Sequence, residues 1–90
     1  MERLHAVVRG DVQGVGFRYF LVDSGRRLGV RGWVRNRPDG SVELVAEGDR
    51  ATLERILEAA RQGPRHARVE DVAVEWQPAT GGLSAFDLTY

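Results

Sequence analysis

The spacing of apolar residues alternates between a strand period and a helix period along the chain, and the order of these periods constrains the fold most strongly. Residues 17–28 and the stretch from Asp49 to Gly63 place apolar side chains on one face of a helix. Asp49 is suited to cap the second helix at its start, and Gly63-Pro64 ends it. The remaining regular segments alternate like strands: residues 4–9, 30–36, 41–47, 69–77 and 85–90.

These segments follow the order β-α-β-β-α-β, with a short fifth strand at the end. Pro38-Asp39-Gly40 separates the second and third strands and is a strong turn signal, so these two strands form a hairpin. The order is that of an α+β, ferredoxin-like sandwich, in which two helices cover one face of a mainly antiparallel sheet. Ninety residues are enough for one domain, which we expect to span residues 1–90.

A glycine-rich segment, Gly10-Asp11-Val12-Gln13-Gly14-Val15-Gly16-Phe17-Arg18, joins the first strand to the first helix. Glycines let the backbone adopt positive φ angles and approach a ligand closely. The first N–H groups of a helix have no intrahelical partners, and the helix dipole adds a partial positive charge there. Arg18 places a permanent cation beside these amides. The segment therefore predicts a binding site for an anion the size of phosphate.

The expected topology brings Asn36 to the same place. Strands 4–9 and 30–36 run parallel with strand 41–47 between them, so their C-terminal ends lie at the same end of the sheet. Strands two positions apart are separated by roughly 10 Å. An anion in the glycine-rich loop would then lie within one water molecule of Asn36, which closes the second strand.

Composition excludes several kinds of chemistry and partner. The chain has no lysine and no cysteine, which excludes a Walker A lysine, a Schiff-base lysine and a cysteine nucleophile. Its two histidines, His5 and His66, are far apart in sequence, so we expect no metal and no cofactor. The 13 basic residues balance 13 acidic ones, which argues against a nucleic-acid partner. No segment resembles a membrane span or a signal peptide, so we expect a cytoplasmic protein without a membrane partner.

The candidate residues favour hydrolysis of a reactive phosphate compound. The loop amides and Arg18 can hold phosphoryl oxygens, and the Asn36 amide can donate to and accept from an attacking water. Because asparagine is not a strong general base, the leaving group must be a good one already. A carboxyl-phosphate anhydride meets this requirement, since its carboxylate leaves without protonation near neutral pH.

Two segments resemble the signatures of the acylphosphatase family. Residues 10–18 match the pattern G-x-V-Q-G-V-x-F-R, and residues 32–42 match G-W-V-x-N-x-x-D-G-x-V. The two patterns occur in the family's order and spacing, and the resemblance covers the whole chain. It implies an acylphosphatase, which hydrolyses the carboxyl-phosphate bond of acyl phosphates without a metal or cofactor.

The resemblance also implies residue roles. Arg18 would bind phosphate and Asn36 would position the water. Family members often end in an aromatic residue, as this chain does at Tyr90, and our own hypothesis is that its terminal carboxylate pairs with Arg18 and holds it in place. We expect a monomer whose partner is a small-molecule acyl phosphate, with phosphate or another anion able to occupy the loop. The residues that would bind phosphate through their backbones are Gln13, Gly14, Val15, Gly16 and Phe17.

Three alternatives remain at this stage. An RNA-recognition module shares the element order but needs aromatic residues on its central strands, and strands 4–9 and 41–47 have none. A non-catalytic anion-binding module would use the same loop but would not need a water-orienting Asn36. A domain of a larger carbamoyl-transfer enzyme is the third alternative. The chain ends where the expected domain ends, which favours a standalone hydrolase.

Overall fold

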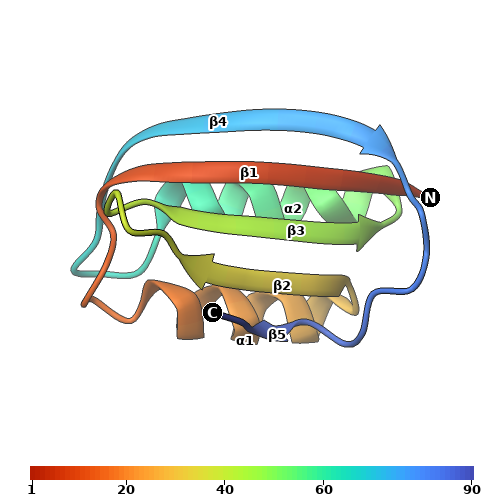
Figure 1. The fold of residues 1–90 in the computed structure, drawn as a ribbon, viewed down its shortest axis with the longest axis horizontal. Coiled ribbons are helices and arrows are strands. Elements are labelled where there is room, and N and C mark those ends of the chain that lie inside the picture. Colours follow the sequence, from red (N-terminus) through yellow and green to blue (C-terminus); the bar gives the residue numbers. More distant parts are fainter.

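The computed structural model describes all residues from 1 to 90 and contains strands and helices in the predicted order (Figure 1). The ferredoxin-like order β-α-β-β-α-β with a short fifth strand is thus confirmed. Neither helix has the length and apolar character that a membrane crossing requires. The elements are β1 (Glu2–Asp11), α1 (Phe17–Leu28), β2 (Arg31–Asn36), β3 (Val42–Gly48), α2 (Arg50–Gln62), β4 (Arg68–Pro78) and β5 (Asp87–Leu88).

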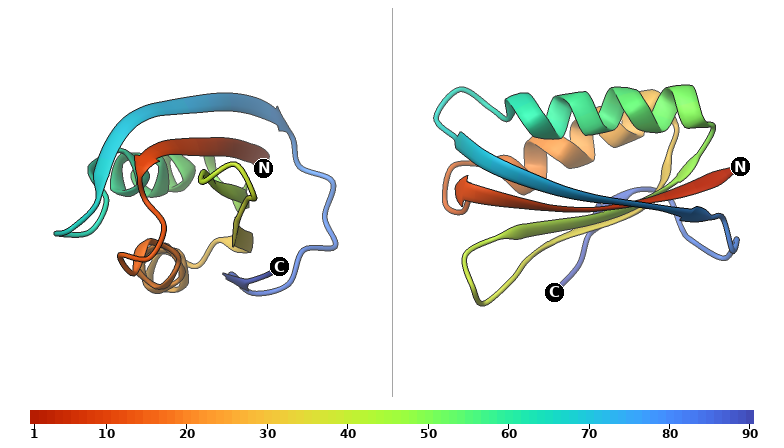
Figure 2. Two further views of the ribbon diagram at one scale, coloured as in Figure 1. Left: turned by 60° about the vertical axis from the view of Figure 1, so that its left-hand side comes forward. Right: turned by 90° about the horizontal axis from the view of Figure 1, so that it is seen from above.

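The strands form one five-stranded sheet in the order β4-β1-β3-β2-β5. Every neighbouring pair is antiparallel except β2 and β5, which are parallel. Both helices cover the same face of this sheet, as the view from above shows (Figure 2). Because β3 lies between β1 and β2, these two strands run parallel and end at the same end of the sheet, as the sequence predicted.

Helix α1 occupies the predicted residues, whereas the strand bounds differ from the prediction. β1 is two residues longer at each end than the alternating apolar pattern predicts. The added residues are held by backbone pairing: Glu2 and Arg3 pair with β3 and β4, and Gly10 and Asp11 pair with β4. β2 and β3 each begin one residue later, and β4 is longer by one residue at each end. Of residues 85–90, only Asp87–Leu88 form a strand, and they pair with Trp33 and Val34 of β2.

Asp49 precedes α2 as predicted, but its side chain does not cap the helix. Its backbone is extended, and its carbonyl accepts a hydrogen bond from the Leu53 N–H at 2.9 Å. Asp49 is thus the N-cap residue as predicted, although its carboxylate makes no capping hydrogen bond. At the other end, the Gly63 N–H donates to the Ala59 carbonyl at 2.8 Å and terminates the helix.

The apolar core lies between the helices and the sheet. One face of β1 and β3 supplies its base, and the apolar faces of α1 and α2 cover it. Removing these side chains from water is the main term that stabilises a chain of this size. The largest fully buried core side chains include Leu4, Leu44, Phe17, Leu21, Leu53, Ile56 and Phe86.

Gly25 lets the C-terminal segment pack directly on α1. A Cβ atom at this position would overlap the ring of Phe86, which is fully buried. The Arg26 Nε also donates to the Phe86 carbonyl at 3.0 Å. A glycine lowers helix propensity in general, and here it is required by the close approach of an aromatic ring.

The sheet face away from the helices contains a group of paired charges, which we call the carboxylate network. It consists of Glu43 with His5 and Arg35, and Glu47 with its donors described below. Glu43 is only 8% exposed, and its Oε atoms lie 2.7 Å from His5 Nε2 and 2.7 Å from Arg35 Nε. Burial alone would raise the pKa of Glu43, but the hydrogen bonds from His5 and Arg35 hold it below its ordinary value.

Glu47 completes the carboxylate network near the other end of β3. Its carboxylate accepts hydrogen bonds from the backbone N–H of Thr80 at 3.0 Å, from that of Gly81 at 3.1 Å, and from Arg3 Nε at 2.8 Å. The Thr80 amide is the main reason why the pKa of Glu47 is lowered. These contacts fix the loop that carries the chain from β4 towards β5.

Candidate active site

The segment of residues 13–18, which we call the cradle, turns sharply between β1 and the first turn of α1. Gly14 and Gly16 have φ angles of 74° and 78°, in the left-handed region, and Gly16 is the N-cap of α1. A Cβ atom at either position would meet nothing within 4 Å. The backbone angles, rather than a lack of space, therefore require glycine at these two positions.

The cradle presents a set of free backbone donors. No N–H group from Gln13 to Tyr19 donates a hydrogen bond within the protein, and the first of the α1 backbone bonds runs from the Phe20 N–H to the Gly16 carbonyl at 3.0 Å. The first turn of α1 contains no acidic side chain that would neutralise the positive end of the helix dipole. Such a group of donors at a helix start is suited to bind an anion.

The cradle and Asn36 line one cavity of about 130 Å³. The C-terminal ends of β1 and β2 and the start of α1 lie at the same end of the molecule, which explains why these distant segments meet (Figure 1). A cavity of this size can hold an anion and a water molecule but not a large ligand. Its lining residues are Val12, Gly14, Gly16, Phe17, Arg18, Tyr19 and Asn36.

Asn36 ends β2, where it pairs with Val42 of β3. Its Oδ1 atom is buried and has no hydrogen-bond partner in the protein. A buried acceptor without a partner costs on the order of 1–3 kcal/mol. An acceptor held in this way on a rigid strand is therefore expected to bond to a water molecule or a ligand in the cavity.

Arg18 lines the cavity, but its contact with Tyr90 differs from the prediction. The guanidinium carbon lies 5.8 Å from the centre of the Tyr90 ring, which is a cation–π arrangement. No ion pair joins Arg18 to the terminal carboxylate, so that expectation is wrong. Because Tyr90 is 94% exposed, its ring stands in water beside Arg18 and leaves the guanidinium free to bind an anion.

Gln13 has a side-chain role that the sequence did not suggest. Its Nε2 donates to the carbonyl of Arg37 at 2.8 Å and to that of Ser41 at 2.9 Å. Both carbonyls belong to the hairpin that follows Asn36, so this side chain ties the cradle to the end of β2. Neither Gln13 nor Val15 lines the cavity, although both were predicted at the site.

The β2–β3 hairpin holds these carbonyls in place. The Arg37 N–H donates to the Ser41 carbonyl at 2.9 Å, and Asp39 accepts from the Ser41 N–H at 3.0 Å and from its hydroxyl at 2.5 Å. The hydroxyl of Ser41 is the main reason why the pKa of Asp39 lies below its ordinary value. The turn is therefore stabilised by an ionised Asp39 at neutral pH.

Two residues line the cavity without having been predicted. Val12 contributes a buried side chain at the end of β1, and Tyr19 follows Arg18 on the exposed side of α1. Val12 lies inside the first signature, where its apolar character could have indicated packing beneath the loop. Tyr19 lies one residue beyond it, and no pattern in the sequence marks it. No group of three or more histidine, aspartate or glutamate side chains is arranged to hold a metal ion.

Comparison with known proteins identifies the family. A family model described as Acylphosphatase matches residues 4–88. The chain belongs to the acylphosphatase family. An acylphosphatase from Anaeromyxobacter dehalogenans (strain 2CP-C) is 50% identical over 88 residues, which are 98% of this chain and 95% of that protein. The crystal structure of acylphosphatase from Bacillus subtilis covers 100% of both chains, with a TM-score of 0.96 and 38% identity.

The same fold also occurs inside a larger protein. The crystal structure of HypF from T. kodakarensis covers 100% of this chain with a TM-score of 0.84 and 31% identity. The matched region is 12% of the HypF chain. The acylphosphatase fold is therefore found both as nearly a whole chain and as a small part of one.

Proposed function

We propose that the cavity binds the phosphoryl group of an acyl phosphate, and that Arg18 and Asn36 promote its hydrolysis to a carboxylate and inorganic phosphate. The observation that carries this proposal is the meeting of two kinds of group in one cavity. One kind consists of the unpartnered backbone donors and Arg18, and the other is the buried Asn36 acceptor. Membership of the acylphosphatase family supplies the reaction class.

The phosphoryl oxygens accept hydrogen bonds from the cradle and from the Arg18 guanidinium. These donors also stabilise the charge that the equatorial oxygens carry in the transition state. The donors are fixed before the substrate arrives, because two left-handed glycines set the loop and α1 continues from it. We assign this role to the backbone N–H groups of the residues that line the cavity, which are Gly14, Gly16, Phe17 and Arg18. Gln13 and Val15 do not line it but lie in the same loop with free N–H groups, and we include them in the proposal.

Asn36 orients the attacking water. Its Oδ1 accepts a hydrogen bond from the water, whose oxygen forms the new bond to phosphorus. The bond between phosphorus and the acyl oxygen breaks, and the carboxylate leaves with the electron pair. The proton of the water passes to the phosphate that is formed. No side chain acts as a general base in this scheme, and no metal or cofactor is required.

Gln13 acts as a positioning residue in the same proposal. Its two hydrogen bonds join the loop that binds the phosphate to the hairpin that begins after the water-orienting Asn36. Transfer to phosphorus depends strongly on the alignment of the water with the leaving oxygen. A tether between the two segments keeps this alignment.

The test is steady-state hydrolysis of benzoyl phosphate in the presence of a chelator, with Arg18→Gln and Asn36→Ala compared with the wild type. Loss of one oriented catalytic donor should lower kcat/KM by about 100-fold or more. Arg61→Gln removes an exposed arginine outside the cavity and serves as the matched charge control. Circular dichroism checks that each variant is folded.

Two results would contradict the proposal. If Asn36→Ala hydrolyses benzoyl phosphate at the wild-type rate, Asn36 does not orient the water. If the wild type binds inorganic phosphate but hydrolyses no acyl phosphate, the site is a binding site only.

We further propose that residues 1–90 form a single acylphosphatase domain that acts as a monomer in the cytoplasm. Arg18, Asn36 and the glycines of the cradle already meet in one cavity within a single copy of the chain, which supports a monomeric enzyme. Light scattering after gel filtration should give a mass close to 10.0 kDa. A mass of twice this value across a dilution series would contradict the monomer, and cell fractionation tests the location.

A further inference from the structure

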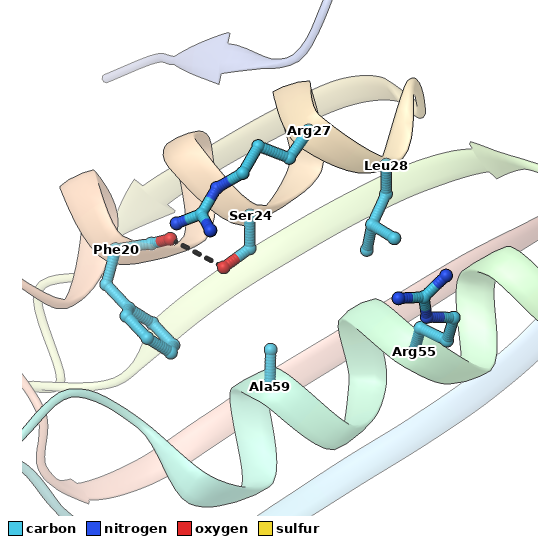
Figure 3. A pocket seen from close by; sticks show the side chains of 6 residues that line it. All are labelled: Phe20, Ser24, Arg27, Leu28, Arg55 and Ala59. Atoms are coloured by element: carbon cyan, nitrogen blue, oxygen red, sulfur yellow. Dashed lines mark hydrogen bonds between the residues drawn. The ribbon is translucent and has the colours of Figure 1, made fainter.

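A second and larger cavity lies between the two helices. It has a volume of about 430 Å³ and is lined by Phe20, Ser24, Arg27 and Leu28 of α1 and by Arg55 and Ala59 of α2. We call it the interhelical groove. None of its residues lines the catalytic cavity. Figure 3 shows the side chains of Phe20 and Leu28 extending from α1 towards α2, with Ala59 on the facing side.

The apolar part of the interhelical groove is only partly covered. Phe20 and Leu28 pack against the core on one side, yet both remain partly exposed on the other. Ala59 is also half-buried and, with its short side chain, leaves the space between the helices open. Apolar surface in a concave site of this kind favours contact with an apolar ligand.

The charged part of the interhelical groove consists of two arginines. Arg27 lies along α1 beside Phe20 and Ser24, and Arg55 extends from α2 on the side of Leu28 (Figure 3). Arg55 makes no ion pair or hydrogen bond. The positions four residues away on its helix are Ala51 and Ala59, which offer no carboxylate. Arg27 pairs with Asp23 at the exposed surface, where such a pair contributes little.

We propose that the interhelical groove binds a small amphipathic anion. The apolar body of the ligand packs on Phe20, Leu28 and Ala59, and its carboxylate, phosphate or sulfonate group pairs with Arg55. Arg27 adds a second positive charge on the facing helix. The Ser24 hydroxyl already donates to the Phe20 carbonyl at 2.9 Å, so recognition of the anionic group falls to the arginines. This binding site goes beyond the proposed hydrolytic function and does not depend on it.

Size and charge favour a small ligand over a second copy of the chain. The groove volume lies within the roughly 300–1,000 Å³ typical of small-molecule sites. A symmetric dimer formed groove to groove would place the same arginines opposite one another across the interface. No acidic side chain lines the groove to compensate this repulsion.

One aromatic pair connects the interhelical groove to the catalytic cavity. The rings of Phe20 and Phe17 meet edge to face with their centres 6.2 Å apart, and Phe17 lines the catalytic cavity. The two sites therefore share the first turn of α1 but no lining residue. A phosphate ion in the cradle should not displace a ligand from the groove.

The experiment is a fluorescence titration with 8-anilinonaphthalene-1-sulfonate, which joins an anionic sulfonate to an aromatic body. It is carried out with saturating inorganic phosphate present, so that the catalytic cavity is occupied. Arg27→Gln/Arg55→Gln should weaken binding about tenfold, because each exposed ion pair contributes a few-fold. Octanoate should compete with the probe for the wild type.

Two further variants distinguish binding of the probe in the interhelical groove from its attraction to arginines elsewhere on the surface. Arg61→Gln/Arg65→Gln removes the same charge from exposed positions outside the groove and should leave binding unchanged. Ala59→Leu keeps every charge but fills the groove, and it should weaken binding about fivefold, since bulk replaces the open apolar space. If the double variant of the groove fails to fold, Arg55→Gln and Ala59→Leu provide the same test.

Three results would overturn the proposal. They are displacement of the probe by phosphate, an equal loss of affinity in the control double variant, and unchanged affinity in both Arg55→Gln and Ala59→Leu. Since these titrations measure binding and not hydrolysis, a failure of the catalytic proposal leaves them unaffected.

Discussion

The cavity beside Asn36 and the carboxylate network are two polar regions of the same sheet, and they differ in how their hydrogen bonds are satisfied. Glu43 and Glu47 each accept hydrogen bonds from several donors, so their burial is compensated. The cavity instead holds the unpartnered Asn36 Oδ1 and the free N–H groups of the cradle. The difference separates two uses of polar residues: the network stabilises the fold, and the cavity keeps hydrogen-bonding capacity for a ligand.

The largest expected effect belongs to Asn36→Ala. It should lower kcat/KM by about 100-fold or more, while the free energy of unfolding stays the same or rises by about 1 kcal/mol, because an unsatisfied buried acceptor is removed. Urea denaturation and benzoyl phosphate hydrolysis of the same sample measure both quantities. A large loss of stability together with activity would show that Asn36 belongs with the structural polar groups instead.

Glu43→Ala should have the opposite profile. His5 and Arg35 lose their shared acceptor, so the free energy of unfolding should fall by about 1–3 kcal/mol, while kcat/KM stays close to the wild-type value. Urea denaturation measures the first quantity and steady-state kinetics the second. Glu43→Gln retains an acceptor and should recover part of the stability. A large fall of kcat/KM in Glu43→Ala, together with its lower free energy of unfolding, would contradict the contrast between the two regions.

Gln13→Met tests the residue that has features of both regions. Its side-chain Nε2 is bonded within the protein, as in the carboxylate network, and its proposed role is to position groups of the cavity. Methionine keeps the length of the side chain but lacks the N–H groups that bond to Arg37 and Ser41. We expect kcat to fall and KM to rise, with kcat/KM reduced about tenfold or less, and a stability loss of about 1 kcal/mol. Gln62→Met, on the exposed surface of α2, is the matched control.

Equal kinetics for Gln13→Met and the wild type would remove the positioning role. Gln13→Glu sharpens the test further. It also loses the donors and places a negative charge beside two carbonyl oxygens, so it should be at least as impaired as Gln13→Met.

The smallest expected effect is the dependence of stability on acid. The pKa values of Asp39, Glu43 and Glu47 are lower in the folded protein than their ordinary values of 3.8, 4.5 and 4.5. The unfolded chain therefore binds more protons in acid, so the stabilisation is complete above these ordinary values and is lost as the pH falls through the folded pKa values. Urea midpoints measured from neutral to acidic pH should show this decline.

The variant Glu43→Gln should make the same decline shallower, because one of the three shifted carboxyl groups is gone. A urea midpoint that rises on acidification would contradict the assigned direction of the shifts.

Much of the fold follows from local signals in the sequence. Helix α1 has the predicted bounds because Gly16 and Gly29, with left-handed backbone angles, flank it at both ends. The full length of β1 could not be predicted from side chains, since its outer residues are held by backbone pairing, to β3 and β4 at its start and to β4 alone at its end. Asp49 shows the reverse case, in which a suitable residue lies at the right position but its side chain makes no cap.

The site was predictable where it depends on topology and not where it depends on the path of a loop. Parallel β1 and β2 bring the cradle and Asn36 to one end of the sheet, and this follows from the order of the elements. The Gln13 tether and the ring contact between Tyr90 and Arg18 arise from loop and terminal conformations. The pattern of apolar and charged residues contains no information about such conformations.

The proposed binding of phosphate by main-chain donors in the cradle has a consequence for how mutations affect the site. Every amino acid except proline carries a backbone N–H, so exchanging the side chain of Val15 leaves the set of donors intact. An alanine scan of the loop would therefore report little at this position, whereas Val15→Pro would delete a donor outright. Binding of an anion by backbone N–H groups tolerates changes of side chain as long as the glycines preserve the shape of the loop.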